Sequence, residues 1–454
     1  MEIIELYKSK KVKLGDGNTT DDIISELCDD ILIMILDFLT LKEAVRTSVL
    51  SRRWQQLWQF FSGSFSFEAS YSRGLNKEKL KTERSRFVGR INKVLNSHQV
   101  STILELRVSF DLGKHSKSYV DEWIGIALKK KVKKLELAFE PYFTSYHKLL
   151  YTCYRISKES FSCFTTSSGS PGTLFLRCLS LQYVGVSDEN VEYILSSCPM
   201  LESLHVRMSP LLRDPKVTGS SLRLKHLNIQ SCEFVQSIEV YAPNLASFEY
   251  YGKEIPLHVR YAPKLHEVCY FDPLNYSIPH AFSQLANYLP QLVSLTLNTS
   301  FDWPSLLLQA HDFPKLTSLR HLSCIDFFFR GKRVPCITPV IEAAPSLHKF
   351  KLEYHNLNKI EKYKLRGVMR RVRGHPNQYL KEVEVIGFYG KEADAEIVTY
   401  LLKSAFMLEK IVIDTRPTKI GHPEEFETVQ KMAKNVARQL MQKQNRAGAE
   451  FVIL

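Results

Sequence analysis

The motif PMLESLHV at residues 199–206 recurs along the chain in variant form. In each copy a proline is followed two residues later by leucine, and two apolar residues at alternate positions close the motif. Period-two alternation is typical of a half-buried β-strand, and proline cannot donate to a strand ladder, so each copy predicts a turn and then a short strand. The clear copies are PMLESLHV (199–206), PNLASFEY (243–250), PKLHEVCY (263–270), PQLVSLTL (290–297) and PSLHKFKL (345–352).

A helix is expected before some of these strands. In SDENVEYIL at 187–195, Ser187 is a candidate N-cap, acidic residues fill the first turn, and Val191, Ile194 and Leu195 share one face. The prolines begin 20 to 44 residues apart, which indicates an irregular leucine-rich repeat. Such units in series predict a curved solenoid with a parallel sheet on its concave side.

Weaker copies extend the repeat in both directions. The segment PKLTSL at 314–319 begins another copy, but His321 occupies its last apolar position, so we expect that copy to be broken. Upstream, LELRV (104–108) and LELAF (135–139) are fainter members. The repeat region is therefore expected to run from about residue 101 to 375.

The C-terminal part predicts one more strand–helix–strand unit. A strand is expected over Tyr379–Ile386, then the turn GFYG at 387–390, a helix over Ala393–Ala405 and a strand over Leu408–Ile413. A late helix over Glu424–Gln444 precedes Phe451–Leu454, which we expect to be a final strand closing the sheet edge.

The N-terminal stretch DDIISELCDDILIMILDFLTLKEAVRTSVLSRRWQQLW at 21–58 predicts three short helices. The first is apolar around nearly its whole circumference, and such a helix must be buried on all sides. A unit of about 40 residues is too small to bury that much surface itself. The excess must contact either the rest of the chain or another protein.

These residues resemble the F-box of plant F-box proteins, in the run ISELCDDIL (24–32), ILDFL (35–39) and EAVRTSVLSRRW (43–54). The family has proline where this chain has Cys28, and proline there would stiffen entry into the first helix. The later repeats resemble those that follow the F-box in plant proteins, and the strand–GFxG–helix–strand order resembles the FBD domain.

The resemblance implies that the module binds a Skp-type adaptor and, through it, a cullin scaffold. The matching adaptor-facing positions are Leu27, Cys28, Ile31, Leu32, Ile35, Leu36, Leu39, Val45, Val49, Leu50 and Trp54. Sequence alone does not sort those that contact the adaptor from those that form the internal core.

The expected fold class is α/β: a small N-terminal three-helix F-box followed by an irregular leucine-rich-repeat solenoid with a C-terminal FBD cap. The expected segments are a disordered tail (1–20), the F-box (21–60), a linker (61–100), the solenoid (101–375) and the FBD domain (376–454).

Composition argues against catalysis and for an interaction protein. The chain has 454 residues and a formal net charge of +13, and we find no HExxH, CxxC, GxSxG or phosphate-cradling glycine loop. We therefore expect no catalytic residue, metal or cofactor. The nine scattered cysteines fit free thiols in a reducing compartment, so we expect a nuclear or cytoplasmic protein with no membrane span or signal peptide.

The leading hypothesis is the substrate-recognition subunit of a Skp–cullin–F-box ubiquitin ligase, which binds a protein substrate through its repeats. A non-ligase F-box scaffold is the alternative, for which Cys28 is the only hint. Nucleic-acid binding rests on charge alone and is disfavoured. The basic run KKKVKK at 129–134 and the segment Lys362–Arg373 are expected to be solvated surface, with nuclear import or an acidic partner as alternatives.

Overall fold

The computed structural model describes residues 23–69, 76–142, 146–162, 175–272, 278–298, 314–326, 340–354, 377–416, 423–444 and 449–454. It divides into two compact units, Met1–Leu212 and Arg213–Leu454. The expected tail at 1–20 and the basic segment Lys362–Arg373 lie outside the described residues.

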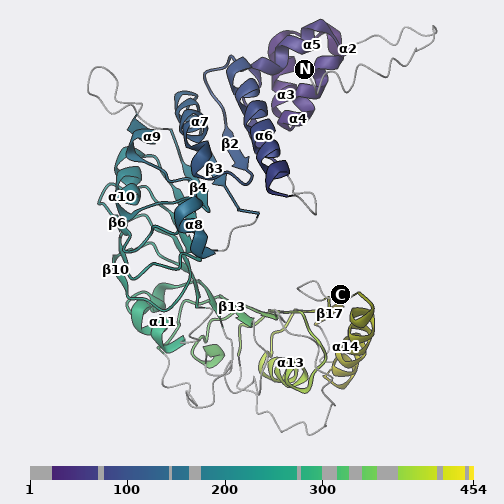
Figure 1. The fold of residues 1–454 in the computed structure, drawn as a ribbon. Coiled ribbons are helices and arrows are strands. Elements are labelled where there is room, and N and C mark those ends of the chain that lie inside the picture. Colours follow the sequence, from purple (N-terminus) through teal and green to yellow (C-terminus); the bar gives the residue numbers. More distant parts are fainter. Residues whose placement is uncertain are drawn as a thin grey trace, which may run out of the picture. The chain divides into compact units, whose positions relative to one another are not determined.

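The first unit begins with short helices: α2 (Ile23–Glu26), α3 (Asp29–Asp37), α4 (Leu41–Arg46), η1 (Thr47–Val49), α5 (Arg52–Leu57) and η2 (Trp58–Phe60). Five parallel strands follow in sequence order: β1 (Ser64–Glu68), β2 (Glu105–Ser109), β3 (Lys134–Ala138), β4 (Cys178–Gln182) and β5 (Ser203–Arg207). The connections carry α6 (Lys77–Ser97), η3 (Lys114–Ser116), α7 (Lys117–Lys129), α8 (Tyr146–Thr152), α9 (Lys158–Ser162) and α10 (Asp188–Ser197). The short helices lie at the β1 end of this sheet (Figure 1).

The stretch 61–100, expected to be a linker, instead contains β1 and the 21-residue α6. The helix buries one apolar face, made by Leu80, Phe87, Val88, Ile91 and Leu95. Their spacing of three, four and seven residues is the helical signal, although lysine and arginine side chains between them obscure it. The sheet therefore starts directly after the N-terminal helices.

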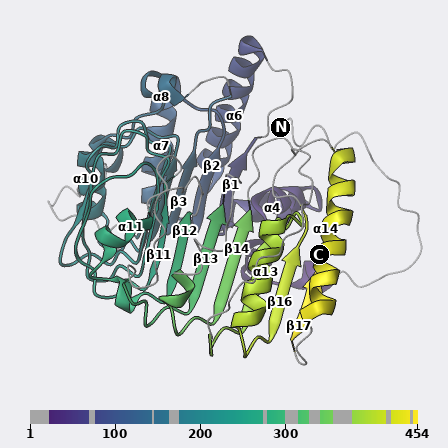
Figure 2. The same cartoon turned by 90° about the horizontal axis from the view of Figure 1, so that it is seen from below.

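The described part of the second unit contributes nine parallel strands to the main sheet: β7 (His226–Gln230), β9 (Ser247–Tyr251), β11 (Glu267–Phe271), β12 (Ser294–Asn298), β13 (His321–Asp326), β14 (Lys349–Tyr354), β15 (Glu382–Ile386), β16 (Lys410–Asp414) and β17 (Glu450–Ile453). Among its described residues the helices are α11 (Ile278–Leu285), η4 (Leu289–Gln291), α13 (Glu392–Ser404) and α14 (Pro423–Gln444). Figure 2 shows these strands side by side, with α13 and α14 beside the last of them. The expected order of helix and strand over 379–454 is confirmed.

A second, three-stranded parallel sheet explains the shortest repeat spacing. It consists of β6 (Lys216–Thr218), β8 (Ile238–Tyr241) and β10 (Leu257–Tyr261), in the order β10-β8-β6. A repeat of 20 residues is too short to hold a strand, two turns and a helix of ordinary length, so a second strand takes the place of the helix. At the β10 edge, the Leu257 N–H donates to Gln284 Oε1 (2.9 Å), which satisfies a donor that an open edge would expose.

The copy that begins at Pro314 is intact, which corrects the expectation that His321 breaks it. In β13, Leu322 and Cys324 are the inward residues, in register with Leu295 and Leu297 of β12. The leucine that precedes this strand is Leu319, three residues after the one we assigned, and both Leu316 and Leu319 are fully buried. His321 is exposed on the opposite face of the sheet.

The GFYG turn depends on two glycines with positive φ, Gly387 (69°) and Gly390 (73°). A Cβ on Gly390 would lie 2.9 Å from the Cα of Ala433 in α14, so glycine is needed there both for the turn and for the helix contact. The Asp394 carboxylate, fully buried, accepts hydrogen bonds from the N–H groups of Tyr389 (3.1 Å) and Lys391 (3.2 Å). These contacts fix the start of α13 after β15.

Candidate adaptor-binding site

The structure divides the predicted adaptor-facing residues into core and surface. Leu32 and Leu36 are fully buried, and Trp54 is 6% exposed, so these three form the internal core. Leu27, Leu39 and Val45 are half-buried. The exposed members are Cys28, Ile31 (40%), Ile35 (39%), Val49 (64%) and Leu50 (66%).

Exposed apolar side chains form a continuous stripe along α3. We call the α3 stripe the residues Ile31, Met34, Ile35 and Phe38, whose spacing of three, four and seven residues places them on one face. Met34 is 58% and Phe38 is 88% exposed, and neither was among the predicted site residues. The helical spacing was visible in the sequence, but Leu32 and Leu36 show an equal spacing on the other face, so the pattern alone did not say which face is inside.

Hydrogen bonds at the helix starts hold this arrangement. Thr40 and Glu43 form a capping box on α4, in which the Glu43 N–H donates to Thr40 Oγ1 (3.3 Å) and the Thr40 N–H donates to Glu43 Oε2 (2.9 Å). These bonds from Thr40 lower the pKa of the Glu43 carboxyl. Ser51 caps α5 by accepting a hydrogen bond from the Trp54 N–H.

Arg53 joins α5 to the start of α3. Its guanidinium donates to Asp29 Oδ1 (2.7 Å) and to the Leu27 carbonyl (2.5 Å). The short helices of this module pack on only a few buried residues. A link between α3 and α5 therefore limits how these two helices can move relative to one another. Trp54 and Leu57, on the same helix, are buried.

Cys28 already has the backbone geometry of proline. Its φ is −68° and its ψ is 158°, close to the φ that the pyrrolidine ring imposes. Among the described residues we find no acceptor for its N–H. The replacement of the family's proline by Cys28 therefore leaves the entry into α3 unchanged in shape.

Cys28→Pro is expected to raise the free energy of unfolding by about 0.4–1 kcal/mol, because it restricts the unfolded chain and fits the native backbone. Cys28→Ala is the matched control and should not stabilise the protein. Urea unfolding of both variants beside the wild type measures the difference. Destabilisation by proline would contradict the geometry described for this residue.

Hydrogen bonds fasten the helical module to the first strand of the sheet. The Asp37 carboxylate accepts from the Ser62 N–H (2.7 Å) and the Ser62 hydroxyl (2.6 Å), just before β1. His98, at the end of α6, is 6% exposed, donates from Nε2 to the Phe61 carbonyl (2.7 Å) and packs against the Phe65 ring. Lys130 donates to the carbonyls of His98 and Val100. We call this set of contacts the β1 joint.

Acid should weaken the β1 joint through His98. Burial lowers the pKa of His98 from 6.5 to about 4, and nearby Lys130 acts in the same direction, although the hydrogen bond to Phe61 opposes it. In the unfolded chain, His98 is protonated below pH 6.5, whereas in the folded chain it is protonated only below about pH 4. The difference corresponds to roughly 3 kcal/mol of unfolding free energy. This stability is fully present above the unfolded-state pKa and is lost as the pH falls toward the folded-state pKa.

His98→Gln keeps a donor for the Phe61 carbonyl but cannot titrate. Its unfolding free energy should fall less steeply than that of the wild type between pH 6.5 and pH 4, when both are followed by urea unfolding. Parallel curves for the two proteins would show that His98 is not the group responsible.

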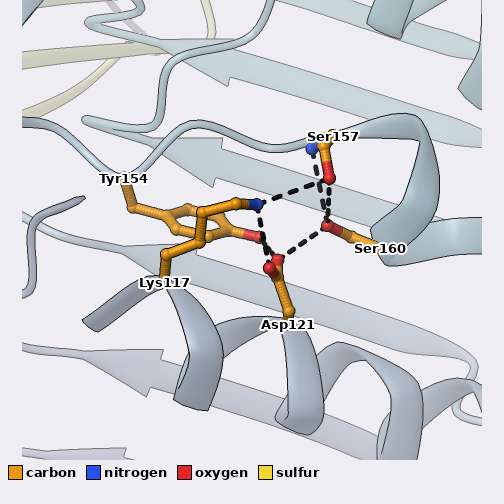
Figure 3. Close-up of polar contacts among 5 residues, drawn as sticks. All are labelled: Lys117, Asp121, Tyr154, Ser157 and Ser160. Carbon is orange, nitrogen blue, oxygen red and sulfur yellow. Dashed lines mark hydrogen bonds and ion pairs between the residues drawn. The ribbon is translucent and has the colours of Figure 1, made fainter. Parts of the chain in front are cut away.

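A polar cluster between α7 and α9 is structural. The Asp121 carboxylate accepts from the hydroxyls of Tyr154 (2.6 Å) and Ser160 (2.7 Å) and forms an ion pair with Lys117 (2.8 Å) (Figure 3). Burial, together with this bond to Asp121, raises the pKa of the Tyr154 phenol. Every member has partners inside the cluster, which therefore ties α7 to the segment before α9 and offers no free nucleophile.

The basic run at 129–134 is largely used within the fold. Lys130 belongs to the β1 joint, Lys134 pairs with Glu105 (2.8 Å), and the Lys131 ammonium lies over the Phe175 ring. Lys129 and Lys133 are exposed. Among the described residues we find no group of His, Cys, Asp and Glu able to hold a metal ion, and none of the described helices is long and apolar enough to span a bilayer.

A small helical module with an exposed apolar stripe, fastened to the first strand of a parallel-strand solenoid, defines a leucine-rich-repeat protein of the F-box class. A family model described as At1g61320/AtMIF1, LRR domain matches residues 94–450, and an F-box domain model matches residues 24–62. The chain belongs to the plant F-box/leucine-rich-repeat family.

Curated relatives from Arabidopsis thaliana carry the same combination of domain names. F-box/FBD/LRR-repeat protein At4g00160 is 27% identical over 440 residues, covering 91% of this chain and 90% of the relative. Putative F-box/FBD/LRR-repeat protein At5g22670 is 32% identical over 225 residues, covering 47% of this chain and 46% of the relative. F-box/LRR-repeat protein 25 is 32% identical, covering 50% of this chain and 84% of the relative.

Proposed function

We propose that this chain is the substrate-recognition subunit of a Skp–cullin–F-box ubiquitin ligase. The observation that carries the proposal is the α3 stripe, four apolar side chains that are 39% to 88% exposed although the chain is large enough to bury them. Exposed apolar surface of this kind marks protein–protein contacts. The Skp-type adaptor is the partner that the F-box resemblance implies, with the cullin bound through it.

In this role the chain itself needs no catalytic group. The F-box end would hold the ligase, the repeats would hold a protein substrate, and tethering would raise the effective concentration of substrate lysines near the ubiquitin-loaded enzyme. The described cysteines are free thiols, which supports a site of action in the nucleus or cytoplasm. The predicted FBD domain at 376–454 would extend the substrate-binding solenoid by the three strands β15, β16 and β17.

The test is reconstitution from purified components. The full chain is mixed with a Skp-type adaptor and a cullin, and complexes are separated by size-exclusion chromatography. We expect the cullin to co-elute with the chain only when the adaptor is present. Co-elution of the adaptor without the cullin would instead indicate a non-ligase F-box scaffold, and absence of both would reject the proposal.

A further inference from the structure

The open face of the second unit carries two glutamates but no lysine or arginine over the first five strands of its main sheet, where the described basic side chains are His226 and His321. We call the central face the side chains of β7, β9, β11, β12 and β13 that alternate with the buried row and point away from it. Among the described side chains, Glu249 and Glu267 are its only carboxylates, and it contains no lysine or arginine. This composition is unexpected in a chain with a formal net charge of +13.

Neighbouring strands show that the sheet normally compensates its charges. On β14 to β17, Lys349 pairs with Glu382 (3.2 Å) and Lys410 pairs with Glu450 (3.1 Å). In the first unit, Lys134 of β3 pairs with Glu105 of β2 (2.8 Å). Among the described residues, neither Glu249 nor Glu267 forms an ion pair with a lysine or arginine, although His226 lies close to Glu249.

The Glu249 carboxylate is held in a fixed position with one oxygen free. Asn228 and Gln230, both on β7, donate their side-chain N–H groups to the same oxygen, Oε2. Oε1 has no hydrogen-bond partner among the described residues. Burial raises the pKa of Glu249 and the nearby charge of Glu267 raises it further, while the hydrogen bond from Gln230 and the nearby His226 lower it. A cation bound between the two carboxylates would therefore stabilise the charged form of Glu249.

An aromatic pair lies beside these carboxylates. The rings of Tyr251 and Phe271 stack with centroids 4.2 Å apart and planes 5° from parallel. Each lies two positions after an open-face residue, Glu249 on β9 and Cys269 on β11, which is about 7 Å further along the strands. A long cationic side chain spans that distance, with its head group on the carboxylate and its stem or plane against the Tyr251 ring.

We propose that the central face binds an extended, basic segment of the protein substrate, with an arginine or lysine head group between Glu249 Oε1 and Glu267 and its side chain along the half-buried Tyr251 ring, which stacks on the buried Phe271. Arginine fits better than lysine, because its planar guanidinium both donates to carboxylates and stacks on aromatic rings. This inference rests on the proposed function, since it names the chemistry of the substrate.

The test measures peptide binding to the purified complex of the full chain with a Skp-type adaptor. The probe is a fluorescent peptide in which arginine alternates with glycine and serine, with lysine and glutamate versions for comparison. We expect the order arginine, lysine, glutamate from tightest to weakest. The double variant Glu249→Gln, Glu267→Gln should bind the arginine peptide at least about tenfold more weakly, the factor that corresponds to about 1.4 kcal/mol.

The double variant Glu189→Gln, Glu192→Gln is the matched control, because both are exposed α10 residues in the first unit and their loss also removes two negative charges. Its affinity should equal that of the wild type. The inference is overturned if the wild type does not bind the arginine peptide, if the glutamate peptide binds equally well, or if the Glu249 and Glu267 double variant behaves like the control. Adaptor retention is measured on the same preparations, and peptide binding is also measured with the chain alone. A chain that binds the peptide but not the adaptor would reject the proposed function and leave this inference intact.

Discussion

Phe38→Asp and Leu50→Asp are each expected to abolish retention of the Skp-type adaptor without unfolding the chain. Phe38 is 88% and Leu50 is 66% exposed, so neither side chain contributes much to the internal core. In an adaptor complex both would be buried, and an unpaired carboxylate in an apolar contact costs about 2 kcal/mol or more, which corresponds to at least about thirtyfold in affinity.

Co-purification with the adaptor, followed by titration in a calorimeter, measures this loss. Met432→Asp is the matched control. Met432, like Phe38 and Leu50, is a large exposed apolar residue (53%), but it lies on α14 in the second unit. It should leave adaptor binding unchanged. Retention of the adaptor by both the Phe38 and the Leu50 variants would exclude the α3 stripe and the Val49–Leu50 segment as the contact.

Leu36→Ala is expected to lose adaptor binding for a different reason, by unfolding the module. Leu36 is fully buried in α3, and truncation of a buried leucine to alanine costs about 3 kcal/mol. A module of this size has little stability to spare. The amide hydrogens of residues 23–60 should therefore exchange much faster than in the wild type, in hydrogen–deuterium exchange followed by mass spectrometry.

Met34→Ala is the control on the same helix, two residues away and 58% exposed. Its exchange should match that of the wild type. Equal protection in the Leu36 and Met34 variants would mean that α3 is oriented differently from the description given above. Leu32 and Trp54 are buried like Leu36, so substitutions at these positions also report on folding and not on contact.

The sequence predicts the strands of this fold better than its surfaces. Every clear PxL copy is followed by a strand, because two apolar residues at alternate positions after a turn fit a strand with one buried face. The strands β1, β4 and β7 were not predicted, and neither were β6, β8 and β10 of the second sheet, because none of them follows a PxL motif. The indirect signal for the second sheet was the 20-residue spacing between Pro243 and Pro263, which leaves no room for a helix.

The residues predicted to face the adaptor could be named from the sequence as a group but could not be sorted into buried and exposed ones. An α3 sequence that is apolar all round has two equivalent stripes, and only the packing of α5 against it decides that Leu32 and Leu36 face inward. Similarly, the role of Asn228 and Gln230 in orienting Glu249 depends on strand register between β7 and β9, which the spacing of repeats does not specify.

The β1 joint has a consequence for the geometry of a ligase. Because Asp37 is hydrogen-bonded to Ser62 and His98 to Phe61, the N-terminal helical module, which we propose holds the ligase, is fastened directly to the first strand. A receptor joined by a flexible linker would hold its bound substrate in many positions, most of which do not allow ubiquitin transfer. Here a substrate bound to the first five strands would lie at a nearly constant distance from the helical module. That geometry favours modification of a few substrate lysines and not of many.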